Sequence, residues 1–253
     1  MLALPLSTCV QKINLFEPIA LWQMDSVKLM ARTDQKFLMP FRLLSSLLED
    51  LRPHYSMLEI NGQRLCDYKT QYFDFLDLRL YHQHHSGQLV RHKVRQRTYV
   101  HSHQVFMEVK TKNNKERTIK NRIHTTAFQD TFDKDSLLFL NQHIPYDPTE
   151  LKPVLWVDYT RLTLVNHAHT ERLTIDLNLT FRSGWRYKNY GQLVVAEVKQ
   201  DGRCDSVFLE LMKRYQIREG GLSKYCLGVV SLCPTIKHNR FKPKLLHLQK
   251  VIQ

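Results

Sequence analysis

The chain has 253 residues and a formal net charge of +13, from 37 Lys and Arg against 24 Asp and Glu, with a pI near 9.6. With no Gly/Ser-rich or Pro-rich linker and no internal repeat, this length predicts a single domain over residues 1–253, with its core at about 17–233. The charge indicates a polyanionic partner, and no stretch approaches the ~20 apolar residues of a membrane span.

The cysteines are scattered along the chain. Cys9, Cys66, Cys204, Cys226 and Cys233 show no CxxC spacing. This pattern is typical of reduced thiols rather than of a disulfide framework, so we expect a cytoplasmic protein.

The first fifty residues predict a helix, a strand and a second helix. Residues 17–30 carry Pro18 in a first helical turn, and residues 31–39 form a short charged strand. Pro40 then opens a helix whose leucines, from Leu43 to Leu51, follow the helical period and which ends at Pro53.

The middle of the chain predicts strands. Residues 69–75 form one, and residues 89–100 and 104–112 form a hairpin around a polar turn. Arg91, Lys93, Arg95 and Arg97 occupy every second position of the first hairpin strand. Alternate residues of a strand share a face, so these cations repel one another unless anions lie between them. Residues 115–124 continue the basic pattern.

The second half predicts a short helix at 135–143, strands at 154–165, 170–181 and 191–200, and a helix at 205–217. In the second of these strands, Leu173, Ile175, Leu177 and Leu179 form an apolar face opposite polar residues. Residues 234–253 are rich in Lys and Arg, and we expect them to form a loose basic tail.

Repeated strands with one charged face each predict an α+β fold of mainly antiparallel β-structure. A closed β-barrel removes exposed strand edges. We therefore expect a barrel whose polar, basic lumen is a binding tunnel and whose helices pack outside.

A series of short motifs, in order over about residues 20–230, carries a family resemblance. The motifs begin with Arg32-Thr-Asp-Gln-Lys36, Tyr72-Phe-Asp74 and Lys93-Val-Arg95-Gln-Arg97, and continue with Glu108-Val-Lys110, Lys120-Asn-Arg122, Tyr159-Thr-Arg161, Arg172-Leu-Thr-Ile-Asp176, Glu197-Val-Lys199 and Ser223-Lys224-Tyr225. They resemble the polyphosphate polymerase domain of the vacuolar transporter chaperone (VTC) family, within the CYTH-like triphosphate tunnel metalloenzymes. The phosphatase and cyclase branch of that superfamily begins with alternating glutamates and lysine, so Arg32, Asp34 and Lys36 favour the polymerase branch.

The resemblance implies transfer of the γ-phosphate of ATP to a growing inorganic polyphosphate chain, with Mn²⁺ or Mg²⁺. It implies a set of catalytic cations, namely Lys36, Arg95, Arg97, Lys110, Lys120, Arg161, Arg172 and Lys224. Further phosphate or nucleotide contacts are expected at Arg32, Lys93, Lys112, Arg122, Tyr159, His84 and Lys199. The metal is expected at Glu197, with Glu108 as the second candidate.

These residue types are suited to phosphoryl transfer. A protein that catalyses this reaction must mainly align the reacting groups and neutralise the charge on the phosphate oxygens. Arginine offers a planar fork to two phosphate oxygens, and Mg²⁺ or Mn²⁺ prefers carboxylate oxygen. The chain has no GxxxxGK[ST] loop, so side chains rather than a glycine-rich loop must bind the phosphates.

Other functions stay open at this stage. A non-catalytic polyphosphate-binding module and a metal-dependent triphosphate hydrolase would use the same tunnel. A zinc site among His82, His84, His85, His101 and His103 fits no standard spacing. Nucleic acid is not expected as a partner, because Tyr99 is the only aromatic residue close to the main basic strand. A separate membrane protein that receives the product is possible.

Overall fold

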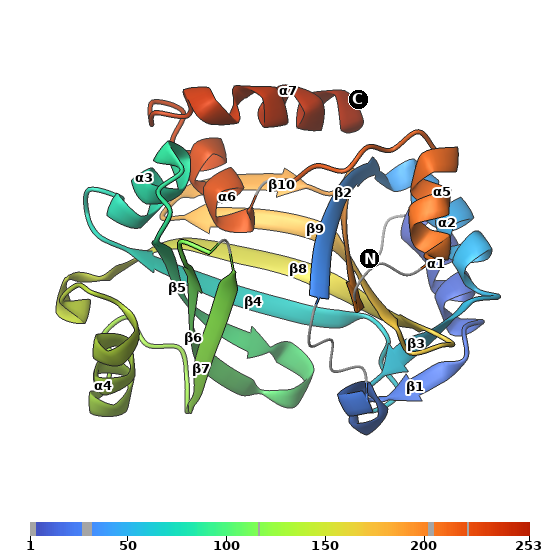
Figure 1. The fold of residues 1–253 in the computed structure, drawn as a ribbon, viewed down its shortest axis with the longest axis horizontal. Coiled ribbons are helices and arrows are strands. Elements are labelled where there is room, and N and C mark those ends of the chain that lie inside the picture. The colour runs from blue at the N-terminus through green and yellow to red at the C-terminus, as the bar shows by residue number, and fades with distance from the viewer. Residues whose placement is uncertain (1–3, 27–31, 116, 202–204, 222) are drawn as a thin grey trace.

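The computed structural model describes residues 4–26, 32–115, 117–201, 205–221 and 223–253. An 11-stranded, almost entirely antiparallel sheet dominates the fold, with helices around it (Figure 1). The strands are β1 (Pro18–Ala20), β2 (Arg32–Pro40), β3 (Tyr55–Glu59), β4 (Cys66–Asp74), β5 (Arg91–Tyr99), β6 (Gln104–Lys112), β7 (Thr118–Thr125), β8 (Lys152–Asn166), β9 (Glu171–Ser183), β10 (Arg186–Tyr190) and β11 (Leu193–Asp201). The α-helices are α1 (Leu4–Asn14), α2 (Leu44–Leu51), α3 (Arg79–Ser86), α4 (Lys134–His143), α5 (Val207–Arg214), α6 (Lys224–Leu232) and α7 (Lys242–Val251). The α+β class is thereby confirmed.

The hydrogen-bonded path runs β2-β11-β9-β8-β4-β5-β6-β7, and within the described residues its two ends do not pair with each other. The closed barrel expected from the sequence is therefore not formed by hydrogen bonds. Part of the free edge of β2 is occupied by residues 219–220: Phe37 bridges to Glu219, and the amide of Gly220 donates to the carbonyl of Lys36 at 2.8 Å.

The sheet is nevertheless strongly curled. Figure 1 shows β2, β6 and β7 in front of the long strands β4, β8 and β9. Glu197 of β11 acts electrostatically on Lys110 of β6, although four strands separate these two strands along the path. The sheet therefore has a concave inner face across which side chains of distant strands meet.

The outer face of the sheet packs against α1, α2 and α5. Leu173, Ile175 and Leu177 are fully buried there, together with the leucines of α2. The helix predicted after Pro40 is confirmed as α2, preceded by a 3₁₀ turn at Phe41–Leu43. A second outer core lies between β4–β6 and α4, around Phe73, Val94 and Leu140.

Strand β9 changes sides at Asn178. This residue has a left-handed backbone (φ 54°), a conformation that asparagine tolerates better than most residues, and the β8–β9 register shifts between Asp158 and Thr160. Leu179 therefore leaves the apolar face of Leu173–Leu177 and packs with Phe181 against α6. The prediction of one continuous apolar face through Leu179 was wrong, because a bulge reverses the alternation.

Helix α6 fills one end of the concave face. Its Tyr225 stacks on Tyr72 of β4, with ring centroids 5.1 Å apart, and the helix contacts β8, β9 and β10. A methyl group at Gly228 would lie 2.5 Å from Leu155 Cδ2, so only glycine permits this approach. The expectation that apolar side chains pack only on the outside of the sheet is corrected at this end.

Two terminal predictions also change. The helix predicted at 17–30 is strand β1 followed by a 3₁₀ helix at Leu21–Ser26, while residues 27–31 lie outside the described part. β1 pairs with β3, which overrides the helical start suggested by Pro18. The basic tail contains α7, anchored by the buried Phe241 and Leu248.

In the described part of the chain, every helix is too short or too polar to cross a membrane.

Candidate functional site

The strand register places the predicted cations on the concave face of the sheet. Lys93, Lys110 and Lys120 lie side by side on β5, β6 and β7. Lys36 pairs with Glu197, and Arg172 with Lys199, on the opposite wall. We call the set the cationic face: Lys36, Lys93, Arg95, Arg97, Lys110, Lys120, Arg161, Arg172, Lys199 and Lys224.

Glu108 is fully buried between two of these cations. Its Oε2 accepts a hydrogen bond from Arg95 Nε at 2.7 Å, and its Oε1 forms an ion pair with Lys120. Burial alone would raise the pKa of Glu108, but Arg95, Arg97 and Lys120 hold that pKa well below its ordinary value. The carboxylate stays ionised and both oxygens are occupied.

Asp176 has the same kind of environment on β9. Arg161 forms a two-point ion pair with it, at 2.6 and 2.9 Å, and Lys224 of α6 approaches its Oδ2. These two cations outweigh the effect of burial and lower the pKa of Asp176. Asp176 thus fixes Arg161 and joins α6 to the sheet.

Glu197 is the most accessible of these three acids. Its side chain is 23% exposed, whereas that of Glu108 is 0% exposed. Lys199 binds one of its oxygens, and Lys36 Nζ lies 4.0 Å from the other. Burial opposes ionisation, but Lys36 and Lys199 lower the pKa of Glu197 to about 2.

Cations outnumber carboxylates on this face, and their pKa values reflect it. The pKa of Lys110 lies well below its ordinary value. The largest cause is the positive charge of Arg95, followed by burial and by the charge of Arg97. Burial lowers the pKa of Lys120 to about 8 despite the opposing effect of Glu108, and burial also lowers the pKa of Lys93. Such crowding is costly without an anion, so the face is suited to a polyanionic ligand.

Tyr159 lies among these cations. Its ring is contacted by Arg161 Cζ, 5.3 Å from the centroid, and by Lys224 Nζ at 4.7 Å. Its hydroxyl is buried and has no hydrogen-bond partner among the described residues. A buried O–H without a partner is unfavourable, and an anionic oxygen bound on the cationic face would accept a hydrogen bond from it.

The acids differ in how well they fit a divalent metal. No group of three or more His, Cys, Asp or Glu that could hold a metal occurs in the described part of the chain. Mg²⁺ and Mn²⁺ do not need one, because they bind through one or two carboxylates plus substrate phosphates. Glu197 fits this arrangement, while Glu108 has both oxygens committed to Arg95 and Lys120.

The remaining predicted residues are placed less centrally. His84 Nε2 donates to the carbonyl of His92 at 3.0 Å, and burial followed by Lys93 lowers the pKa of His84 to about 2. The neutral ring then has only an acceptor left for a ligand, which favours a structural role. Lys112 is half-buried beside Arg91, Arg122 is exposed, and the side chain of Arg32 lies outside the described residues.

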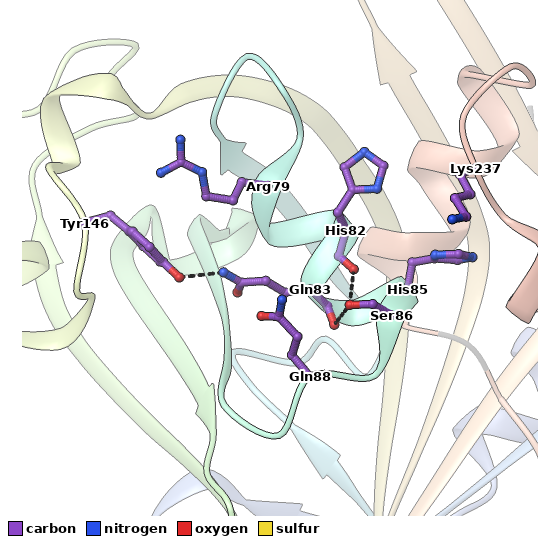
Figure 2. A pocket seen from close by; sticks show the side chains of 8 residues that line it. All are labelled: Arg79, His82, Gln83, His85, Ser86, Gln88, Tyr146 and Lys237. Carbon is purple, nitrogen blue, oxygen red and sulfur yellow. Dashed lines mark hydrogen bonds between the residues drawn. The ribbon is translucent and has the colours of Figure 1, made fainter.

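The sequence did not predict the role of Asp176. Its place on the same strand face as Arg172 follows from the sequence, but its ion-pair partners Arg161 and Lys224 do not. The sequence also did not predict a separate hollow of about 410 Å³ beside α3 (Figure 2). His82, His85 and Lys237 line this hollow, and Gln83 Nε2 donates to the hydroxyl of Tyr146 at 2.6 Å. None of the predicted phosphate-binding residues lies in it.

Comparison with known proteins gives one informative match. Residues 31–233 match the model of the VTC domain. No curated protein matches the chain. Among solved structures, the chain is similar to the PH1012 protein from Pyrococcus horikoshii OT3 (TM-score 0.43, 10% identity, covering 77% of this chain and 98% of that one). It is also similar to a conserved hypothetical protein from Pyrococcus furiosus (TM-score 0.42, 12% identity, 77% and 99% covered).

Proposed function

Because the chain belongs to the VTC-domain family, we propose that it is a polyphosphate polymerase that transfers the γ-phosphate of ATP to inorganic polyphosphate. The observation that carries this proposal is the cationic face, which holds more cations than its carboxylates neutralise, inside a curled sheet. A chain of phosphates supplies the missing negative charge in a linear form that follows the strands.

The cations would have two kinds of work. Arg161 is held rigidly by the buried Asp176 and can align phosphate oxygens without reorganising, while Arg95, bound to the buried Glu108, supports the site from below. Lys110 and Arg97 form no ion pair with a carboxylate among the described residues, and they can neutralise the charge on the transferring group. Tyr159 can donate a hydrogen bond from its hydroxyl to a phosphate oxygen.

Glu197 is the residue we propose for a Mn²⁺ or Mg²⁺ ion. When bound, such a metal supplies charge stabilisation on the transferring phosphoryl oxygens. Lys36 and Lys199 keep Glu197 ionised in the absence of metal, since they lower its pKa. With ATP as donor we place the reaction in the cytoplasm, and a separate membrane protein could receive the polymer.

The first test is a reaction of purified protein with ATP and Mn²⁺. We expect ADP together with long polyphosphate. Phosphate without polymer would assign the triphosphate hydrolase, and ligand binding without either product would assign the non-catalytic binding module.

Glu197→Gln separates catalysis from binding. The variant keeps the shape of the side chain but loses the charge that a divalent ion needs, so polyphosphate synthesis should fall at least about a hundredfold. Binding of tripolyphosphate without metal should be unchanged or tighter, because one negative charge has gone. The matched variant Glu108→Gln should instead lower the unfolding midpoint in urea. Full synthesis by Glu197→Gln would move the metal to another residue.

A further inference from the structure

A pocket of about 340 Å³ opens at the end of the cationic face that lies away from α6. Helix α6 packs near Tyr72 and Leu155, whereas this pocket is walled by Tyr68 and Tyr99 at the opposite ends of β4 and β5. Phe106, Ile60 and other apolar side chains add to its lining, and its volume is typical of a small-molecule site.

The aromatic rings of this pocket are suited to holding a planar ligand. Tyr99 meets Tyr68 at a centroid distance of 5.0 Å and Phe106 at 5.8 Å, edge to face in both cases. Arg122 also lines the pocket, with its guanidinium carbon 4.7 Å from the centroid of Phe106. Aromatic rings and a guanidinium plane are the groups on which nucleobases stack.

The pocket adjoins the cationic face at Tyr68. The other neighbours of this ring are Tyr159, stacked at 5.0 Å, and the guanidinium groups of Arg161 and Arg97, at 5.2 and 5.4 Å. One side chain therefore separates an apolar aromatic pocket from a row of phosphate-binding cations. A nucleoside triphosphate has the same layout, with a planar base at one end and a row of phosphates at the other.

Polar groups at the rim complement this assignment. Asp67, His101 and Gln104 line the pocket, and Asp67 Oδ2 lies 3.9 Å from His101 Nε2. Asp67 also accepts a hydrogen bond from Thr160 at 2.7 Å, which holds it in place. A carboxylate at this position can accept a hydrogen bond from an amino group of a base.

We infer that this pocket binds the base of the nucleoside triphosphate, with the triphosphate running inward past Arg97 and Arg161. The inference rests on the proposed function for the identity of the phosphate donor. Bare polyphosphate has no group that fills an apolar pocket. Tyr99 and Phe106 therefore distinguish a nucleotide from an inorganic phosphate chain.

The test compares two ligands by calorimetry in Mg²⁺: β,γ-imido-ATP and inorganic tripolyphosphate. Tyr99→Ala should weaken binding of the nucleotide about tenfold, the size of one lost stacking contact, and change tripolyphosphate binding less than about twofold. Tyr99→Phe keeps the ring and should restore nucleotide affinity. Trp185→Ala removes an exposed aromatic residue outside the pocket and should change neither affinity.

Three results would each overturn the inference. Tyr99→Ala could lose affinity equally for both ligands, or it could keep its affinity for the nucleotide. The unaltered protein could also fail to bind the nucleotide. A selective loss in a protein that makes no polymer from ATP would keep the pocket assignment and reject the polymerase. Polymer synthesis from ATP with no selective loss in Tyr99→Ala would keep the polymerase and reject the pocket assignment. The two proposals can therefore fail separately.

Discussion

At the scale of single residues, the arginines of β5 have different roles although they look equivalent in the sequence. Arg95 is bound to the buried Glu108, and its guanidinium also donates to the hydroxyl of Tyr72 at 3.1 Å. Arg97 donates to Thr70 at 3.3 Å and contacts the rings of Tyr68 and Tyr159. No carboxylate in the described part of the chain forms an ion pair with Arg97. Arg95 therefore belongs to the framework of the site, and Arg97 is available to a ligand.

Arg97→Ala should accordingly weaken tripolyphosphate binding by about 1.5–3 kcal/mol, the value of a hydrogen bond to a charged group. Its urea midpoint should change little. Arg95→Ala should lower the unfolding free energy by about 3 kcal/mol or more, because it leaves Glu108 with one partner fewer in a buried position. Calorimetry and urea titration on both variants check the difference, and equal destabilisation of the two would contradict this division of roles.

Lys120 predicts a pH dependence of binding. Burial lowers its pKa to about 8, so the free protein loses this charge as the pH rises above that value. Tripolyphosphate binding favours the protonated amine, so affinity should fall between about pH 7 and 9.5, by up to about tenfold per unit for one proton. Lys120→Arg stays charged and should reduce this slope.

Unfolding of the protein caused by deprotonation of Lys120 would not account for a fall in tripolyphosphate affinity at high pH. Because the pKa of Lys120 is lower in the folded state, the unfolded chain binds more protons between about pH 8 and 10.5, and Lys120 makes folding more favourable as the pH rises. An affinity that does not change with pH in the unaltered protein would show that Lys120 does not contact the anion.

At the scale of elements, α6 depends on close contact with the inner face of β8 and β9. Ser223 caps the helix by accepting a hydrogen bond from the amide of Cys226, and Tyr225 reaches the carboxylate of Asp74. Lys224, at the first turn, is directed to Asp176. The helix therefore both fills one end of the concave face and contributes a cation to the site.

Gly228→Ala tests this packing. The added methyl group would meet Leu155 Cδ2 at 2.5 Å and Phe181 Cδ1 at 2.7 Å, so the helix must shift, and we expect a loss of about 1–3 kcal/mol in the free energy of unfolding. Gly220→Ala is the matched control, since nothing lies within 4 Å of its added methyl group. Urea titration measures both. A fully stable Gly228→Ala variant would mean that α6 is not held in this position.

At the scale of the whole molecule, curling of the sheet makes one site from strands that are distant in sequence. Glu197 of β11 interacts electrostatically with Lys36 of β2 and with Lys110 of β6, and Lys36 also acts on Lys93 of β5 across the concave face. No pair of neighbouring strands contains this combination. The net charge of +13 is therefore partly concentrated on the concave face.

The sequence by itself determined the VTC family, the long strands β2, β4, β5, β6, β8, β9 and β11, and along most of their length which face carries charge; β1, β3, β7 and β10 were not predicted as strands. Alternation along β5 depends only on the two-residue period of a strand, which is a local property. The leucines of α2 follow a helical period for the same kind of reason. Such patterns can be read without knowing where the strands meet.

Only the tertiary structure decided which cations are free and which are neutralised. Glu108, Asp176 and Glu197 have the same chemistry in the sequence, but Lys120 and Lys36 reach Glu108 and Glu197 from other strands, and Lys224 reaches Asp176 from α6. Tertiary contacts also formed β1 from a stretch expected to be helical, and they moved Leu179 to the inner face through the bulge at Asn178. Pairing and burial depend on side chains brought together from distant positions, and their energies exceed the weak local preferences that a sequence expresses.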